Sequence, residues 1–246
     1  MSELELAANV QRGDHGFDVK RVQEWLTLQG FGLSIDQDFG PATEAAVEQF
    51  QTWNGLDADG VVTPELFALL VAPMRAALQP IAPDGRTLGA LTIAYAQQHL
   101  AEHPLEVGGD NRGPWVRLYM AGEDGPDQKW CAGFACFCLE QAASSLGVTP
   151  PIEASSACTD LGRSAKAHGL FVSGADAAIA TRLTPGSFLL RRTSPTEWHH
   201  TGLVTAAAAE TFTSIEGNTN DAGSSNGYEV CLRTHGYAPY DFILIA

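Results

Sequence analysis

The chain has 246 residues, of which 45% are hydrophobic and 17% are charged. This composition is typical of a globular protein with one large or two small domains, and it excludes an intrinsically disordered chain. Lys and Arg number 14 against 29 Asp and Glu, so the formal net charge is −15. Nucleic acids and anionic membrane surfaces attract basic patches, and we therefore expect neither as a partner.

The sequence has no apolar stretch of the roughly 18 residues that a transmembrane helix needs. Its first six residues include two Glu and neither Lys nor Arg, whereas a secretory signal peptide begins with basic residues and continues with an apolar stretch. We therefore expect synthesis in a cytoplasm without a signal peptide, and no insertion into a membrane. The five cysteines are an odd number, which argues against a disulfide framework and leaves at least one thiol free.

Residues 1–72 form the first unit, which we predict to be a bundle of three short helices. Apolar residues recur at helical spacing over 19–26 and over 43–50. A third helix is expected after Thr63, because Thr is a favoured N-cap residue and Pro64 would occupy the first helical position.

The same unit contains an imperfect internal repeat. Two turns that contain Asp and Gly, at 36–41 and 55–60, each precede a helix that begins at a Thr. The characteristic residues of the unit are Gly13, Gly16, Val22, Gln23, Leu26, Gly30, Asp38, Phe39, Gly40, Thr43, Ala46, Val47, Phe50, Gln51, Gly55, Leu56, Asp59, Gly60, Thr63 and Leu66. This set resembles the peptidoglycan-binding module of many cell-wall hydrolases. The resemblance implies that peptidoglycan is a partner of the protein.

Residues 73–86 are rich in proline and contain the turn signal Asp84-Gly85, so we interpret them as a linker. The second domain then extends over residues 87–246. It is expected to begin with a helix over 88–100.

Cys131 lies at the start of a predicted helix that ends at Gly147. The backbone N–H groups of a first helical turn are unpaired and the helix dipole favours an anion, so a thiolate is stabilised at this position. The other cysteines are expected to be buried as small apolar side chains; they are Cys136, Cys138, Cys158 and Cys231.

The second half of the domain is predicted to form an antiparallel sheet. The expected strands are 186–191, 200–205, 211–217, 228–233 and 240–245. His199 and His200 begin one strand and point to opposite faces, so at most one can face a thiol. Glu216 and Asn218 are two residues apart and are candidates to orient that base. The remaining histidines are expected to be solvated; they are His15, His99, His103, His168 and His235.

Four segments in this order carry a second resemblance: 130–134, 185–188, 200–204 and 215–220. They look like the CHAP family of cysteine- and histidine-dependent amidohydrolases and peptidases, which have a papain-like core. The fold class that follows is α+β, with a three-helix N-terminal bundle and a papain-like domain. In that domain the helix that bears the cysteine packs on an antiparallel sheet.

The CHAP resemblance implies a role for each candidate residue. Cys131 would be the nucleophile, His200 the base and Glu216 the residue that orients the base. Asn218 would contribute to orientation or to the oxyanion environment, and the choice between His199 and His200 stays open.

Substrate contacts are expected from residues close to these motifs, namely Trp130, Asn111 and Trp198. The sequence shows no zinc-ligand spacing, phosphate-binding loop or dinucleotide fingerprint, so neither a metal nor a cofactor is expected.

The leading hypothesis is a peptidoglycan hydrolase, either an amidase or an endopeptidase, that cleaves an amide bond of the stem peptide or crosslink. It would act on the bacterial cell wall as an interbacterial effector toxin with an immunity protein, or as a phage endolysin. Two alternatives stay open. One is a non-catalytic wall-binding or phage structural protein, and the other is a papain-like amidohydrolase with a substrate outside the wall.

Overall fold

The three helices predicted for the first unit are present in the computed structural model, which describes residues 3–224 and 226–245. They are α1 (Phe17–Leu28), α2 (Pro41–Trp53) and α3 (Pro64–Leu70). The hydroxyl of Thr63 accepts a hydrogen bond from the Leu66 amide at 3.2 Å, which confirms the predicted N-cap. Apolar side chains from all three helices meet in a core without solvent exposure, among them Val22, Val47 and Phe67.

The internal repeat has a structural counterpart in two glutamines. Gln23 of α1 donates a hydrogen bond to Asp36 at 2.8 Å and accepts one from the Gln37 amide at 3.0 Å. Gln51 of α2 donates to Asp59 at 2.7 Å and accepts from the Gly60 amide at 3.0 Å. In each half, a nearly buried helical amide therefore organises the following aspartate-containing loop.

The segment predicted to be a linker is more ordered than its prolines suggest. It begins with a further helix, α4 (Ala72–Ala77), in which Met74 is fully buried. The end of α4 and the segment after it are held to the next helix, Leu88–Ala101. Gln98 of that helix donates hydrogen bonds to the carbonyls of Ala77 and Gln79 at 2.9 Å. Pro73 lies in the first turn of α4, where a missing N–H costs nothing, so it starts this helix rather than interrupting one.

The second domain combines helices with an antiparallel sheet. Its helices are α5 (Leu88–Ala101), α6 (Pro114–Tyr119), α7 (Cys131–Leu146), α8 (Cys158–Ala167) and α9 (Ile179–Arg182). Its strands are β1 (Phe171–Ser173), β2 (Phe188–Ser194), β3 (Glu197–Ala207), β4 (Thr211–Thr219), β5 (Glu229–Gly236) and β6 (Tyr240–Ile243). An α+β architecture is thus confirmed.

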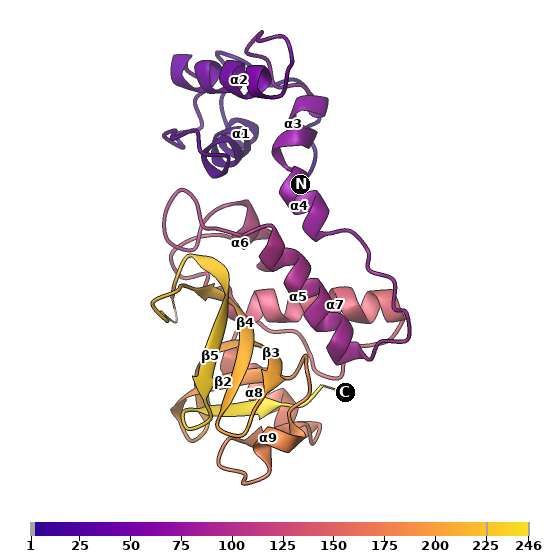
Figure 1. Ribbon diagram of the computed structural model, residues 1–246. Coiled ribbons are helices and arrows are strands. Elements are labelled where there is room, and N and C mark those ends of the chain that lie inside the picture. Colours follow the sequence, from indigo (N-terminus) through magenta and orange to yellow (C-terminus); the bar gives the residue numbers. More distant parts are fainter. Residues whose placement is uncertain (1–2, 225, 246) are drawn as a thin grey trace.

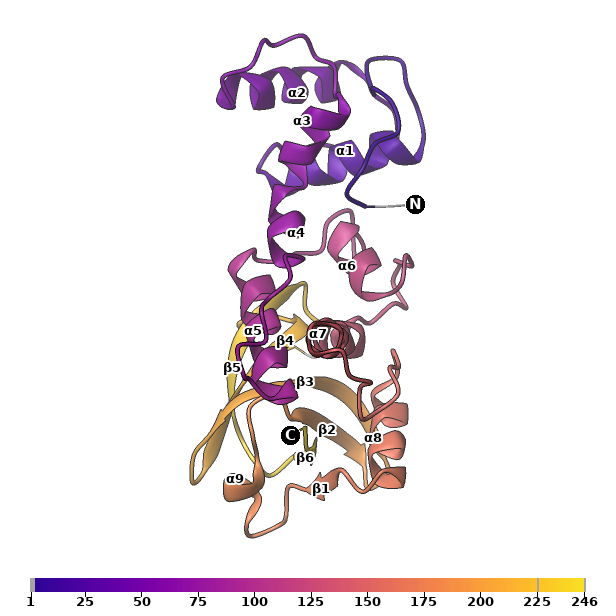
Figure 2. The same ribbon diagram turned by 90° about the vertical axis from the view of Figure 1, so that its right-hand side faces the viewer.

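Over the described residues the strands form one sheet in the order β1-β6-β2-β3-β4-β5. Helices α5 and α7 pack against each other and lie between the sheet and the N-terminal unit (Figures 1 and 2). Helix α8 also packs on β3, near the start of that strand at Trp198 (Figure 2). The last strand, β6, is inserted between β1 and β2, a pairing that local sequence patterns do not specify. None of the helices in the described part of the chain is both long and apolar enough to cross a bilayer.

His99 was expected to be solvated, but the structure buries it completely. Its ring nitrogens lie 2.9 Å from the Tyr119 hydroxyl and 2.9 Å from the Gln141 side-chain oxygen. Burial lowers the pKa of His99 to about 4, so this side chain is a neutral core residue. The prediction was wrong because α5 lies against α7, and the face that carries His99 becomes interior.

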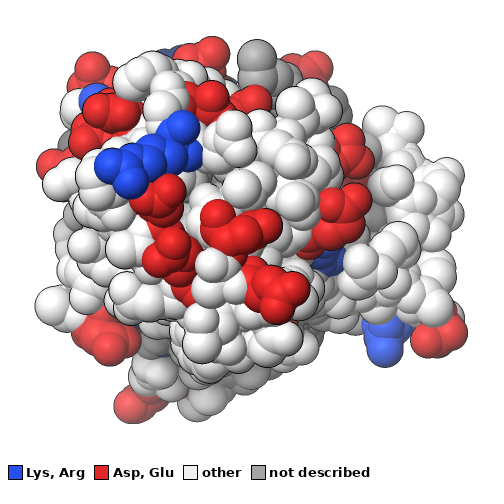
Figure 3. Space-filling view, turned by 90° about the horizontal axis from the view of Figure 1, so that it is seen from above, with Lys and Arg blue, Asp and Glu red and all other residues white. Residues whose placement is uncertain are grey.

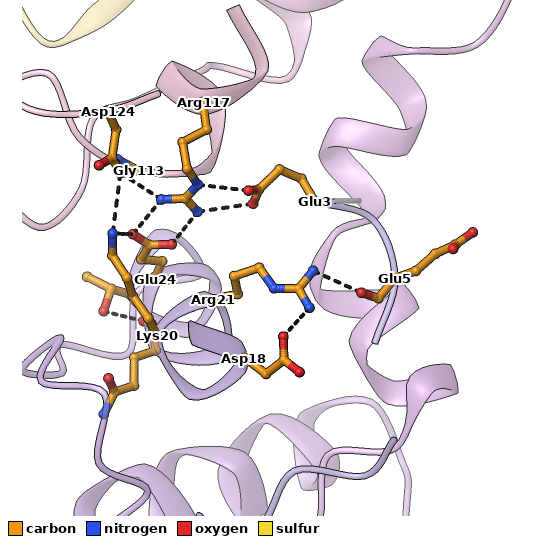
Figure 4. Close-up of polar contacts among 11 residues, drawn as sticks. Glu3, Glu5, Asp18, Lys20, Arg21, Glu24, Gly113, Arg117 and Asp124 are labelled. Atoms are coloured by element: carbon orange, nitrogen blue, oxygen red, sulfur yellow. Dashed lines mark hydrogen bonds and ion pairs between the residues drawn. The ribbon is translucent and has the colours of Figure 1, made fainter. Parts of the chain in front are cut away.

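The two domains meet at a buried guanidinium. Arg117 of α6 contacts Glu3 at 2.7 Å, Glu24 of α1 at 2.6 Å and Asp124 at 2.7 Å (Figure 4). Lys20 of α1 adds a second positive charge, with its ammonium 3.3 Å from Asp124. Burial alone would lower the pKa of Arg117, but the bonds to Glu24 and Glu3 outweigh burial and raise this pKa above its ordinary value.

Apolar packing accompanies this ionic contact. The rings of Trp25 in α1 and Trp115 in α6 meet edge to face with centroids 6.0 Å apart, and both side chains are buried. Because α6 in turn packs on α7, the N-terminal unit is joined by contiguous contacts to the helix that bears Cys131 (Figure 2). The two domains are therefore packed directly against each other.

Substitution of Arg117 tests this interface. Arg117→Met should lower the free energy of unfolding by about 3 kcal/mol, because it leaves buried carboxylates without their partner. Urea denaturation followed by tryptophan fluorescence measures the change. Arg163→Met is the matched control, since Arg163 forms an exposed pair with Asp160 and should have little effect. Equal effects of the two substitutions would contradict a stabilising role for the buried cluster.

Candidate active site

Cys131 is the first residue of α7, as the sequence predicts, and only 2% of it is exposed. The N-cap residue, Trp130, makes no side-chain hydrogen bond to the first turn, so the N–H groups there stay available to an anion. A Cβ on Gly133 would lie 2.4 Å from the Tyr119 carbonyl oxygen, so glycine is needed for α7 to approach α6. These features bring the start of α7 into the interior with its N–H groups uncapped.

His200 of β3 is the histidine that the structure places beside Cys131, and it is 3% exposed. His199 points the other way and bonds the Thr193 hydroxyl at 2.8 Å. Burial opposes protonation of His200, but the neighbouring thiolate of Cys131 and the Glu216 carboxylate outweigh it and raise the pKa of His200 to about 10. The thiol of Cys158 and the imidazole of His200 together overcome burial and hold the pKa of Cys131 well below its usual range. Both shifts favour a thiolate and imidazolium over the neutral thiol and imidazole.

Glu216 of β4 orients the imidazole. Its Oε2 accepts a hydrogen bond from His200 Nε2 at 2.7 Å, and both side chains are buried. The other ring nitrogen of His200, Nδ1, is buried and has no hydrogen-bond partner among the described residues. A Cβ at Gly202 would lie 2.4 Å from the Glu216 side chain. The glycine two residues after His200 thus leaves room for the carboxylate to reach the ring.

A second histidine contacts the same carboxylate, and sequence reasoning missed it. His235 of β5 donates from Nε2 to Glu216 Oε1 at 2.6 Å, while its Nδ1 lies 2.8 Å from the Tyr240 hydroxyl. Ser214 donates to the same oxygen at 2.5 Å. Burial by itself would raise the pKa of Glu216, but the hydrogen bonds and charges of His200 and His235 outweigh it and hold that pKa well below its usual range. His235 was expected to be solvated because only the pairing of β5 with β4 shows that it shares a face with Glu216.

Asn218 takes part in a polar cluster with Asn111 and Glu106. None of the hydrogen bonds described for it reaches the thiol, the imidazole or Glu216; its amide donates to Asn111 at 2.8 Å and to Glu106 at 3.2 Å. The residue has a positive φ of 54°, and the pairing of β4 with β5 shifts register after Glu216. This irregularity breaks the alternation on which the prediction of a shared face rested.

The three residues expected to contact substrate are buried. Trp130 is fully buried and its indole donates to Glu106 at 2.8 Å, and Asn111 is 1% exposed in the same cluster. Trp198 is 4% exposed, donates to Asp241 at 2.9 Å and packs against Gly162 of α8. These side chains therefore shape the surroundings of the site and present almost no surface to a substrate.

One group of side chains within 3–224 and 226–245 is close enough to hold a metal ion. Asp221, Glu229 and Cys231 offer ligand atoms that lie within 4.8 Å of one another. Glu229 already has a partner, since His103 lies 2.9 Å from its carboxylate. Asp221 is exposed, and exposed acidic groups commonly gather without an ion.

Comparison with known proteins identifies the N-terminal domain. Residues 15–70 match a family described as a putative peptidoglycan binding domain. The N-terminal part of the chain is thus a peptidoglycan-binding domain, as its sequence resemblance predicted.

Individual relatives share only part of the chain. A zinc D-Ala-D-Ala carboxypeptidase of Streptomyces albus G is 55% identical over 66 residues, which cover 25% of this chain and 25% of that protein. The solved SleB N-terminal domain is 33% identical over 28% of this chain and 94% of its own, with a TM-score of 0.27. The Burkholderia AP3 phage endolysin is 28% identical over 38% of this chain and 50% of its own, with a TM-score of 0.26. The chain thus spans a quarter of the length of the curated carboxypeptidase.

Alkylation with iodoacetamide at pH 6, followed by peptide mass analysis, tests the ion pair. Cys131 should react first, because the pKa of Cys131 is lowered whereas burial raises the pKa values of Cys136 and Cys231 to about 11. The pair exists above the lowered pKa of Cys131 and is lost as pH rises through about 10, where His200 loses its proton.

His200→Ala should slow the reaction of Cys131 at pH 6 at least about tenfold, the effect of one pKa unit. His168→Ala is the control, since His168 is exposed and bonds only the Ser164 carbonyl among its described contacts. Preferential alkylation of another cysteine in the wild type would refute the assignment.

Proposed function

We propose that the protein is a peptidoglycan hydrolase that cleaves an amide bond with Cys131 as nucleophile, His200 as general base and acid, and Glu216 as the orienting residue. The observation that carries the proposal is the buried thiol at a helix N-terminus beside an imidazole that is bonded to a buried carboxylate at 2.7 Å. Nucleophile, base and orienting group in this order define nucleophilic acyl transfer. In this proposal residues 87–246 are a CHAP-like domain with a papain-like core.

The chemical steps follow from the charges of the site. The Cys131 thiolate attacks the amide carbonyl carbon, and the resulting oxyanion is stabilised by backbone N–H groups at the start of α7. His200 gives its proton to the leaving amine and the C–N bond breaks, which leaves a thioester. His200, now neutral, takes a proton from water, and the hydroxide releases the acyl group and restores the thiolate. Glu216 keeps the ring aligned and stabilises its charged form in the buried site.

The peptidoglycan-binding domain supports a wall substrate, because a bound enzyme meets its substrate at a high effective concentration. A relative that matches a quarter of the chain is named as a zinc D-Ala-D-Ala carboxypeptidase, which is the name of a hydrolytic enzyme. The scissile bond is in the stem peptide or the crosslink. Delivery as an interbacterial effector, with an immunity protein as partner, and release as a phage endolysin are both compatible with this activity.

Digestion of purified peptidoglycan tests the proposal. The wild type should release soluble fragments, and Cys131→Ala should lower the rate at least about a thousandfold, because it removes the activated thiolate. Mass analysis of the fragments identifies the bond that is cut. Cys138→Ala serves as a control, since Cys138 is buried in the same helix and has no role in the steps above. If walls from several species stay intact with the wild type, the alternative of a non-catalytic wall-binding protein replaces the enzyme.

Trp53 is the residue of the N-terminal domain that we propose for contact with the wall. It is 70% exposed, although an indole of this size is usually buried, and its ring meets Phe31 edge to face at 6.0 Å. Figure 3 looks onto the end of the molecule where the N-terminal domain lies, and acidic side chains outnumber basic ones on this face. Binding to an anionic wall therefore has to rest on specific contacts, such as an indole stacked on a sugar ring.

Sedimentation with purified peptidoglycan measures this contact. Trp53→Ala, made in the Cys131→Ala background so that the wall stays intact, should weaken binding about tenfold, since one aromatic contact contributes about 1 kcal/mol or more. Leu232→Ala is a matched control, because Leu232 is 60% exposed in the other domain. Unchanged binding of the Trp53 variant would move the wall contact to another surface of the domain.

A further inference from the structure

A second thiol lies against the candidate nucleophile. The sulfur of Cys158 is 3.7 Å from the sulfur of Cys131, and Cys158 is buried as the first residue of α8. The hydrolytic steps described above make no use of Cys158. Two sulfurs at the N-termini of two different helices therefore meet at the reactive position of the site.

The fold holds Cys158 in this place. Thr159, the next residue of α8, donates to the Trp198 carbonyl at 3.1 Å and accepts from the Trp198 amide at 3.1 Å. Trp198 belongs to β3, the strand that also carries His200, and its ring lies on Gly162 of α8. A Cβ at Gly162 would be 2.6 Å from that ring, so α8 is seated directly on the strand. The contact of the two sulfurs is thus fixed by the hydrogen bonds of the Thr159 hydroxyl to the backbone of β3 and by close packing.

We propose that Cys131 and Cys158 form a reversible disulfide that blocks the nucleophile and makes the site sensitive to oxidation. A disulfide joins its sulfur atoms at about 2.05 Å, so side-chain rotation has to close less than half of the present separation. The consequence for hydrolysis rests on the proposed function, but the disulfide itself does not.

A hydroperoxide such as hydrogen peroxide supplies the oxidising equivalents. The Cys131 thiolate attacks one peroxide oxygen, the O–O bond breaks, and Cys131 becomes a sulfenic acid while the other oxygen leaves as hydroxide and takes up a proton. The Cys158 sulfur then attacks the Cys131 sulfur, the S–O bond breaks, and the thiol proton and the hydroxyl leave as water. Two thiols and one hydrogen peroxide give one disulfide and two waters, and a dithiol such as dithiothreitol reverses the change.

The other cysteines are poorer partners for this reaction. Cys136 directs its thiol to the Ser155 carbonyl at 3.8 Å, and Cys231 lies on β5. Burial raises the pKa of each to about 11, and it also keeps Cys138 a thiol. Since the thiolate reacts with peroxide, oxidation should begin at Cys131 and be resolved by the sulfur that touches it.

Mass spectrometry of the full chain after treatment with hydrogen peroxide tests the pair. The reduced wild type should lose two hydrogen atoms, peptide mapping under non-reducing conditions should join the peptides of Cys131 and Cys158, and dithiothreitol should restore the mass. In Cys158→Ser the sulfenic acid has no resolving partner, so Cys131 should gain two oxygen atoms as a sulfinic acid that dithiothreitol does not reduce. Cys158→Ala gives a second variant in case the serine protein does not fold.

Cys136→Ser is the matched control, because this cysteine is also buried near the start of α7, and it should oxidise as the wild type does. A wild type that goes directly to sulfinic acid, or a disulfide that persists in both Cys158 variants, overturns the proposal. Digestion of peptidoglycan before and after oxidation is measured in parallel. A disulfide in a protein without lytic activity would reject the proposed function alone, and a lytic protein without the disulfide would reject this inference alone.

Discussion

The burial of the Glu216 carboxylate is the constraint on which the rest of the site depends. A charge removed from water is costly unless it is paired and hydrogen-bonded, and here both oxygens are used, by His200 on one side and by His235 and Ser214 on the other. These partners come from β3, β5 and β4 itself, so the carboxylate fixes three neighbouring strands relative to one another. The imidazole that it orients is then held at the start of α7, where the thiol lies.

The interface between the two domains also contains a buried charge that is paired and hydrogen-bonded. Arg117 is buried among the carboxylates of Glu3, Glu24 and Asp124, and this arrangement is stable only while the N-terminal domain stays docked on α6 (Figure 4). Because α6 packs directly on α7, the N-terminal domain and the candidate nucleophile are parts of one packed body. A flexible tether would let the two domains move independently, whereas this connection holds them in one orientation.

The features at the start of α7 that activate Cys131 as a nucleophile also make it prone to oxidation. The same uncapped helix terminus, buried imidazolium and neighbouring thiol that favour the Cys131 thiolate also make it the sulfur most open to oxidation. Cys158 gives that oxidation a reversible end point, because a sulfenic acid with an adjacent thiol forms a disulfide rather than a higher oxide. Both properties follow from the packing of α7 and α8 on a single strand, β3.

The sequence by itself determined the features that depend on near neighbours in the chain. Periodic apolar residues located α1, α2 and α7, Thr63 marked a helix start, and the helix position of Cys131 singled out one thiol among five. Contacts between distant elements were decided only by the tertiary structure. Strand pairing brought His235 to Glu216, a register shift after Glu216 placed an irregularity at Asn218, and the docking of α8 brought Cys158 to Cys131. Local periodicity reports which face of an element is apolar, but it carries no information about which other element will cover that face or in which register.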